Sequence, residues 1–233
     1  MICILFRFNY KKIKKVVIYM SGKVYLIGGG PGDPKLMSLK GKEIIERADV
    51  VVYDRLAGEM FLSYVSENCE IIYAGKGSTE GGVIQDWINK TLAEKAMSGK
   101  TVARLKGGDP FIFGRGGEEA ICLAERGIEF EIIPGISALA SVPAYAGIPV
   151  THRGASNEIH VYTGSSKEGG IPFDLKTAAQ NSGTSVIFMG VSGIGAVMKG
   201  ILENGKPKDT PVAVIENGTT SSQRVVMKLS RYV

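Results

Sequence analysis

Residues 23–34 read KVYLIGGGPGDP, and this stretch decides the fold that the chain is expected to adopt. The segment VYLIGG has the continuous apolar character of a buried strand, and a glycine-rich turn follows it directly. The next segment, SLKGKEIIERA (38–48), predicts a helix with Leu39, Ile44 and Ile45 turned inward. A strand, a tight turn and a helix in this order are typical of the start of an α/β fold.

The same alternation continues along the first half of the chain. Runs of Val and Ile without strict alternation are typical of strands that are covered on both faces, which predicts a parallel, doubly wound sheet. Further strands are expected at 50–53, 70–74, 101–105 and 130–134, and helices at 59–65, 84–97 and 116–126.

A second set of elements follows Pro134-Gly135. Strands are expected at 158–164, 185–190, 211–218 and 223–229, and helices at 137–147 and 191–203. The fold class predicted is therefore α/β, with two α/β domains at 21–135 and 136–233 and the active site in the cleft between them.

The formal net charge of +5 is confined to one end of the chain. Five of the 28 basic residues lie in residues 1–20, where there is no acid, so the remaining chain carries 23 charges of each sign. A neutral body does not favour a duplex-binding protein, so we expect no nucleic-acid partner. The apolar runs of 1–20 are too short to span a bilayer. We expect upstream sequence before a start at Met20, with a basic membrane-surface helix as the alternative.

Cysteine and histidine usage argues against several kinds of site. Cys3, Cys69 and Cys122 are odd in number and form no CxxC, which predicts reduced thiols in a cytoplasmic protein. His152 and His160 have neither ligand nor nucleophile spacing, so we expect no metal site and no catalytic triad. The chemistry should instead depend on positioning and on a reactive cosubstrate.

The turn GGGPGDP (28–34) follows the first strand, where open α/β sheets bind ligands. It fails as a dinucleotide fingerprint because Asp33 stands at the third glycine position. Pro31 and Pro34 also remove two N–H donors. An acidic turn with few free amides suits a cationic or zwitterionic ligand better than a pyrophosphate. The alternative is a tight turn that binds no ligand.

Polar residues follow three successive predicted strands. Asp54 comes at the end of the second strand in YDRL, and Lys76 after the third in AGKGS. Asp109 follows the fourth, in RLKGGDPFIFGRGG (104–117). Because the carboxyl ends of parallel strands meet at one edge of a sheet, the three side chains predict a functional site there.

The motifs GGGPGDP, YDRL, AGK, RLKGGDPFIFGRGGEE, PAYAGIPVTHR, FMG and VIENGTTSSQR occur in this order. With them, the chain resembles the uroporphyrinogen-III C-methyltransferases of the tetrapyrrole methylase family over essentially residues 23–229. The resemblance implies a homodimer and S-adenosyl-L-methionine as cosubstrate, with no metal. It also implies methylation of two pyrrole carbons of uroporphyrinogen III, giving precorrin-2 on the way to sirohaem or cobalamin.

The resemblance assigns the methyl-donor contacts motif by motif. Two glycines of the loop after the fourth strand are expected to let backbone approach the donor closely, and the acid beside them to face its cationic end. The implied donor contacts are Pro31, Gly107, Gly108, Asp109, Ile112, Ser137, Ala138, Met189 and Gly218.

The remaining roles concern the tetrapyrrole. The resemblance makes Asp54 the proton acceptor and Lys76 the proton donor. Uroporphyrinogen III carries eight carboxylates, so a neutral protein needs a locally basic cleft, and Arg forks match carboxylates bidentately. Arg115 and Arg153 are the cations expected to supply it, with Arg55 and Lys106 nearby in sequence. Glu118 is expected to orient Arg115 or to hold a pyrrole N–H.

The chain also departs from the family pattern. It has GGG where GAG is usual and AGKGS where a GKR-type turn is usual. It stops at Tyr232-Val233, where the family adds a helix and a closing strand, which predicts a truncated second domain. Two rival functions stay open: a nicotinamide-dependent enzyme with Asp54 as the ribose-binding acid, and a tetrapyrrole carrier without catalysis.

Overall fold

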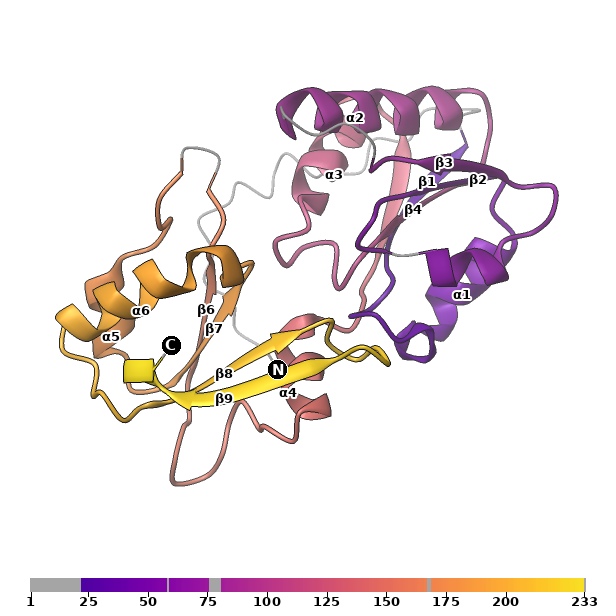
Figure 1. Cartoon of the computed structure of the whole chain (residues 1–233). Coiled ribbons are helices and arrows are strands. Elements are labelled where there is room, and N and C mark those ends of the chain that lie inside the picture. The colour runs from indigo at the N-terminus through magenta and orange to yellow at the C-terminus, as the bar shows by residue number, and fades with distance from the viewer. Residues whose placement is uncertain (1–21, 58, 76–80, 167–168, 233) are drawn as a thin grey trace. The chain divides into compact units, whose positions relative to one another are not determined.

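The computed structural model describes residues 22–57, 59–75, 81–166 and 169–232, of which 59, 81–84 and 232 are described by their backbone only. The chain divides into two compact units, one reaching to Ser137 and the other beginning at Ala138 (Figure 1). This division lies two residues beyond the boundary expected from the sequence at 135. Residues 1–20 and Lys76 lie outside the described residues.

The first unit is built on a five-stranded sheet in the order β3-β2-β4-β1-β5. All of its strand pairings are parallel, which confirms the α/β class predicted from the sequence. The strands are β1 (Lys23–Gly28), β2 (Val50–Tyr53), β3 (Glu70–Tyr73), β4 (Val102–Lys106) and β5 (Glu129–Ile133).

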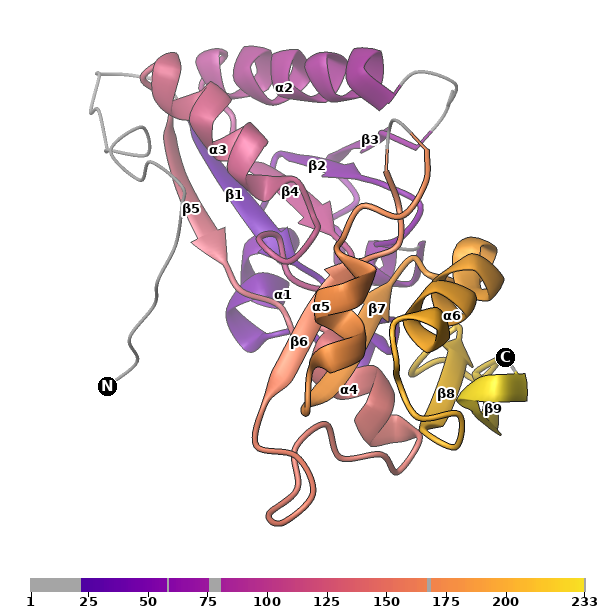
Figure 2. The same cartoon turned by 90° about the vertical axis from the view of Figure 1, so that its left-hand side faces the viewer.

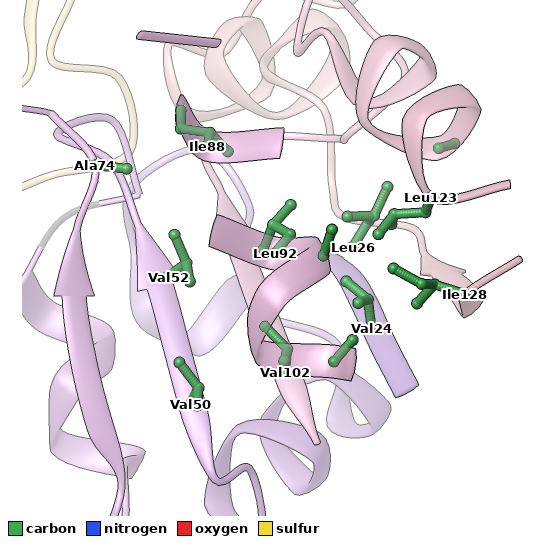
Figure 3. Close-up of a cluster of buried hydrophobic side chains, with 13 residues drawn as sticks. Val24, Leu26, Val50, Val52, Ala74, Ile88, Leu92, Val102, Leu123 and Ile128 are labelled. Atoms are coloured by element: carbon green, nitrogen blue, oxygen red, sulfur yellow. The ribbon is translucent and has the colours of Figure 1, made fainter. Parts of the chain in front are cut away.

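Helices cover both faces of this sheet. In Figure 2, α2 (Gly81–Met97) and α3 (Gly116–Glu125) lie on one face and α1 (Leu39–Glu46) on the other. Each face has its own apolar cluster, so the strands are buried on both sides. Figure 3 shows the α2–α3 side, where Ile88, Leu92 and Leu123 face the valines of β1, β2 and β4. Complete burial of one such side chain stabilises the fold by roughly 1.5–3 kcal/mol.

Two of the three residues of helix α1 that were predicted to be buried are buried in the structure. Ser38 caps it by accepting a hydrogen bond of 3.1 Å from the N–H of Gly41, and Ile44 and Ile45 are fully buried as predicted. The prediction that Leu39 also turns inward is wrong, because the exposed fraction of Leu39 is 79%. Leu39 precedes Ile44 by five residues, and at about 100° per residue that spacing places the two on opposite helix faces.

The second unit is smaller and mixed in topology. Strands β6 (Ile159–Thr163) and β7 (Thr184–Phe188) pair in parallel. Strands β8 (Pro211–Glu216) and β9 (Arg224–Leu229) form an antiparallel pair. Its helices are α4 (Ala138–Tyr145), α5 (Leu175–Gln180) and α6 (Ile194–Glu203). Short 3₁₀ segments of the chain lie at Pro34–Leu36, Glu59–Tyr64, Val191–Gly193 and Ser230–Tyr232.

Helix α5 was not predicted from the sequence. It has only 6 residues, and so few positions do not reveal a helical period in the apolar residues. Asp174 starts it by accepting hydrogen bonds from the N–H groups of Lys176 and Thr177. Ala178 and Ala179 then pack against Val197 and Ile201 of α6, and this contact forms the core of the unit. Among the described residues, no helix combines the length and apolarity needed to cross a membrane.

Glu131 on β5 provides a test of the electrostatics of the first unit. It accepts hydrogen bonds from Lys40 and, at 2.9 Å, from Lys23, and these hold the pKa of Glu131 below its ordinary value of 4.5. A carboxyl whose pKa is lowered by folding adds stability above its unfolded pKa and loses it as pH falls through the folded pKa.

We therefore expect Glu131→Gln to reduce the free energy of unfolding at neutral pH by at most about 1 kcal/mol, because the pair is partly exposed. The deficit should vanish in acid well below pH 4.5. Urea titrations across this range measure it, with Glu125→Gln at the exposed end of α3 as the control. A deficit that grows on acidification would contradict the assignment.

Candidate functional site at the carboxyl edge of the sheet

The order of the strands places the topological switch point of the sheet between β1 and β4. The chain leaves β1 towards α1 on one face, and leaves the neighbouring β4 towards α3 on the other. In open α/β sheets, ligands bind at the carboxyl ends of two neighbouring strands whose connections diverge in this way. The segments that follow these strand ends are the two glycine-rich motifs at 28–34 and 107–117.

Three glycines bring the loops after β1, β4 and β5 into backbone contact. A Cβ on Gly28 would lie 2.5 Å from Cα of Gly135, and a Cβ on Gly135 would lie 2.1 Å from the carbonyl oxygen of Gly108. The N–H of Gly108 donates to the carbonyl of Gly30 at 2.7 Å, and the N–H of Gly30 donates back at 3.2 Å. We call Gly28, Gly108 and Gly135 the glycine junction. A side chain at Gly28 or Gly135 would prevent this close approach of the loops, whereas Gly108 is favoured by its left-handed φ of 64°.

Asp109 fastens this junction. Its Oδ1 accepts a hydrogen bond of 2.8 Å from the N–H of Phe111, and its Oδ2 accepts one of 3.1 Å from the N–H of Gly135. Its carboxylate thus ties the loop after β4 to the loop after β5. Asp33, the acid of the first turn, accepts a hydrogen bond of 2.9 Å from the N–H of Lys35 and caps the 3₁₀ segment there. Both acids therefore shape the loops in which they lie.

The other expected donor contacts of the first unit lie around these loops. Pro31 and Ser137 are half-buried, and Ile112 is exposed over 37% of its surface. Gly107 is required for packing, because a Cβ there would lie 2.9 Å from the carbonyl oxygen of Leu56. Glycine is thus expected at position 107 to admit a ligand, and it is also needed because the backbone of Gly107 lies close to the turn after β2.

Asp54 projects from the end of β2 and is held at both carboxylate oxygens. Oδ1 accepts hydrogen bonds of 3.1 Å from the N–H groups of Leu56 and Ala57. Oδ2 pairs with Nη2 of Arg104 at 2.9 Å. The Asp54 side chain keeps 27% of its surface exposed, whereas the Arg104 side chain keeps 2%. Asp54 is thus an accessible carboxylate anchored to a buried guanidinium.

Arg104 belongs to a buried ionic cluster with Lys106 and Glu119. The Oε1 atom of Glu119 accepts from Nε of Arg104 at 3.1 Å, from Nζ of Lys106 at 2.9 Å and from Nε2 of Gln85 at 3.2 Å. Glu119 is fully buried, and its Oε2 has no hydrogen-bond partner among the described residues. Burial lowers the pKa of Lys106, the charge of Arg104 lowers it further, and Glu119 opposes both.

This cluster corrects one expectation and adds residues that were missed. Lys106 was expected near the basic cleft, but its side chain is only 4% exposed and is paired with Glu119. Arg104 and Glu119 were not singled out. The signal for them was available, since Arg104 and Lys106 are two residues apart on a strand and thus share one face. Two cations on a face of the sheet that is covered by helices would be costly to bury unless a carboxylate was buried beside them.

Arg115 and Glu118 form the pair that was expected from their spacing. Nε of Arg115 donates to Oε1 of Glu118 at 2.8 Å, and these hydrogen bonds raise the pKa of Arg115. Glu118 thus orients Arg115 at the start of α3. Arg153 lies on an exposed turn closed by hydrogen bonds between His152 and Ser156. The structure does not pair Arg153 with any of the residues above.

Met189 and Gly218 belong to the second unit. Met189 has a left-handed φ of 54°, is 53% exposed and lines a pocket of about 490 Å³ together with Gly164, Ile171 and Val197. A Cβ on Gly218 would lie 2.4 Å from Cγ2 of Val142, so α4 requires glycine there. Ala138, the last of the expected donor contacts, is the first residue of α4 and is half-buried.

Backbone strain gathers in the same motifs. Among the described residues, the non-glycine residues with positive φ are Phe113, Arg115, Met189, Asn217 and Thr219. All five fall in the GGDPFIFGR, FMG and ENGTT motifs. Residues held in this region cost about 1–3 kcal/mol each and are concentrated at functional sites. Strain therefore supports the same motifs that the sequence analysis selected.

A doubly wound sheet with glycine-rich loops at its switch point, and with an anchored carboxylate after the adjoining strand β2, is the architecture typical of ligand-binding α/β proteins. The described residues contain no group of His, Cys, Asp and Glu side chains that could hold a metal ion. The family model for tetrapyrrole (corrin/porphyrin) methylases matches residues 23–231. The chain belongs to this family, which confirms the resemblance found in the sequence.

Relatives with known names agree with this membership. The chain is 48% identical over 210 residues to the S-adenosyl-L-methionine-dependent uroporphyrinogen III methyltransferase of Methanosarcina barkeri, a match that covers 88% of this chain and 82% of the relative. It is 48% identical over 206 residues to the uroporphyrinogen-III C-methyltransferase of Bacillus subtilis, covering 88% and 80%. The sirohaem synthase of Pseudomonas fluorescens is 43% identical, but the chain spans only 47% of its length.

Solved structures show the same fold. The uroporphyrin-III C-methyltransferase of Thermus thermophilus, in complex with S-adenosyl homocysteine, superposes with a TM-score of 0.78 at 36% identity, covering 90% of this chain and 84% of that one. Diphthine synthase has a TM-score of 0.61 at 16% identity, covering 91% and 83%, and so shares the fold alone. The tetrapyrrole methylase type of α/β fold is thereby confirmed.

The glycine junction leads to a prediction. Gly135→Ala should destabilise the fold by about 1–3 kcal/mol, since its Cβ would overlap the carbonyl of Gly108. Gly117→Ala is the matched control: its Cβ meets nothing within 4 Å, and in a helix it should stabilise by up to about 1 kcal/mol. Urea unfolding measures both, and equal effects would contradict the junction.

The ionic cluster leads to another. Glu119→Gln leaves Arg104 and Lys106 buried without their carboxylate, so we expect a loss of about 3–5 kcal/mol in the free energy of unfolding. Glu129→Gln removes a carboxylate whose side chain is 41% exposed, at 3.4 Å from Lys23, and should cost at most about 1 kcal/mol. Similar losses in the two variants would show that the cluster does not support the fold.

Proposed function

We propose that this chain is an S-adenosyl-L-methionine-dependent uroporphyrinogen-III C-methyltransferase. It methylates two pyrrole carbons, C2 and C7, and gives precorrin-2 for sirohaem or cobalamin biosynthesis. The observation that carries the proposal is the 48% identity, over 88% of the chain, to a methyltransferase of that name. The position of the glycine junction at the switch point of the sheet supports it independently.

The donor would be held by the loops of the first unit. The junction leaves no room for side chains at Gly28 and Gly135, Gly108 has a left-handed φ of 64°, and Asp109 ties the loop after β4 to the loop after β5. The residues that would surround the donor there are Pro31, Gly107, Gly108, Ile112 and Ser137, and the second unit would contribute Ala138, Met189 and Gly218. The sulfonium supplies an electrophilic methyl group, so the protein has to align the reactants and exclude water.

Methyl transfer to a pyrrole carbon leaves a positive charge on the macrocycle, and Asp54 would accept the proton that the macrocycle then releases. Its carboxylate is accessible and fixed in orientation, which suits a general base at a set position. Lys76, the expected proton donor, stays a proposal on its motif alone. Arg115, oriented by Glu118, and the exposed Arg153 would bind the propionate and acetate groups of the substrate.

Transfer of labelled methyl groups from S-adenosyl-L-methionine to uroporphyrinogen III tests the proposal. We expect two labels per tetrapyrrole, inhibition by S-adenosyl homocysteine and no metal requirement. Binding of a nicotinamide cofactor without donor binding would instead support a dehydrogenase. Binding of tetrapyrrole without transfer would support a carrier. We also propose a homodimer in the cytoplasm, which light scattering after gel filtration and cell fractionation would test.

Replacing Asp54 by Asn should slow methyl transfer by about 10²-fold or more, the range expected when a general acid–base group is lost. Calorimetry should show unchanged donor affinity, because the junction does not use the Asp54 side chain. Asp209→Asn makes the same chemical change at an exposed position of the second unit and should leave the rate unchanged. If Asp54→Asn turned over normally, Asp54 would be a turn residue only.

A further inference from the structure

Arg104 occupies an unusual position for a charged side chain. It lies in β4, an interior strand of the sheet, where all five residues are buried, and its own exposed fraction is 2%. Buried ionic groups are often no more stabilising than apolar residues of similar volume, because their desolvation cost is high. Stability of the sheet therefore does not account for a guanidinium here.

The hydrogen bonds of Arg104 connect the buried core of the unit to Asp54 in the candidate site. Nη1 donates to the carbonyl of Leu105 at 2.9 Å, and Nε donates to Oε1 of Glu119 at 3.1 Å. Nη2 is directed to Oδ2 of Asp54 at 2.9 Å. All three guanidinium nitrogens are thus used, and the planar group is fixed before any ligand binds.

Glu119 in turn is fixed by residues that do not reach the site. Its Oε1 also accepts from Lys106 and from Gln85 of α2. The chain of contacts runs from α2 and α3 through Glu119 and Arg104 to Asp54, and each buried member is at least 95% shielded from solvent. Only the last member, Asp54, has substantial access to solvent.

We propose that Arg104 is a positioning residue for Asp54, and that Glu119 and Lys106 hold Arg104 in place for this purpose. The backbone N–H groups of Leu56 and Ala57 fix one oxygen of Asp54, and Arg104 fixes the other. With both oxygens fixed, the carboxylate cannot rotate away from its accessible orientation. This inference rests on the proposed function, in which Asp54 accepts the proton that the macrocycle releases after methyl transfer.

Arg104→Met tests the inference, since it keeps the volume and leaves Glu119 paired with Lys106. We expect kcat to fall about ten-fold, as a misplaced general base loses part of its effect, with unchanged donor affinity. Arg104→Lys should not restore the rate, because one ammonium cannot reproduce the three-way contact. Arg126→Met, an arginine of the same unit that bonds to Cys122, is the matched control and should leave kcat unchanged.

A double-mutant cycle separates positioning from a general structural role. If Arg104 acts through Asp54, then Arg104→Met should cause no further loss in the Asp54→Asn background. If the losses of the two single variants multiplied in the double variant, the inference would be overturned. A normal kcat in Arg104→Met, while Asp54→Asn is slow, would also overturn it. Such results would leave the proposed function intact.

Crystal structures of the wild type and Arg104→Met provide a readout that needs no activity. We expect the Asp54 carboxylate to change its conformation or spread over several in the variant. An unchanged single conformation would overturn the inference even if the chain did not methylate uroporphyrinogen III. Failure of the wild type to methylate this substrate, with Asp54 released in the variant, would instead count against the proposed function alone.

Discussion

The carboxylate of Glu119, set against two cations in the middle of the first unit, is the interaction on which the sheet and the site both depend. Arg104 and Lys106 lie on one face of β4, which is bordered by β1 and β2. Without a buried anion, two positive charges would lie side by side in a low-dielectric interior, where like charges repel strongly. Because Glu119 is on α3, it also links that helix to the strand that precedes it.

Removing one member of such a cluster is costly, yet a complete buried ionic cluster often stabilises a fold no more than apolar residues of the same volume would. An apolar cluster, such as the one drawn in Figure 3, stabilises through contact area and tolerates small shifts. A hydrogen-bonded ionic cluster is directional, so it fixes the angle of each member. On the α2–α3 side of the sheet, valines and leucines supply the free energy of folding, and Glu119 with Arg104 supplies the orientation of Asp54.

Local sequence pattern was sufficient for most of the fold, and it placed Asp54 and Asp109 after two strands that the structure makes neighbours in one sheet. A strand that is covered on both faces can be recognised from a run of neighbouring apolar residues. The ends of β1 to β5 were therefore predicted to within one residue. Pattern failed where the information is not local. Six-residue α5 exists because Ala178 and Ala179 pack on α6. The error at Leu39 has another origin, since the helical period itself places Leu39 opposite Ile44. The burial of Lys106 against Glu119 was not predicted, because a sequence shows a charge without showing its partner.

The glycine junction and the ionic cluster are separate devices, yet they meet at one point of the chain. Lys106 ends β4 inside the cluster, and Gly108 begins the junction, so only Gly107 lies between them. Gly107 in turn packs directly on the carbonyl of Leu56, whose N–H holds Asp54. A displacement of the loop after β4 would therefore press on the turn that carries Asp54. Gly107 meets the backbone carbonyl of Leu56, and the backbone N–H of Leu56 donates to the Asp54 carboxylate. The position of the loop that is proposed to hold the methyl donor is therefore coupled to the position of the carboxylate that is proposed to take the proton.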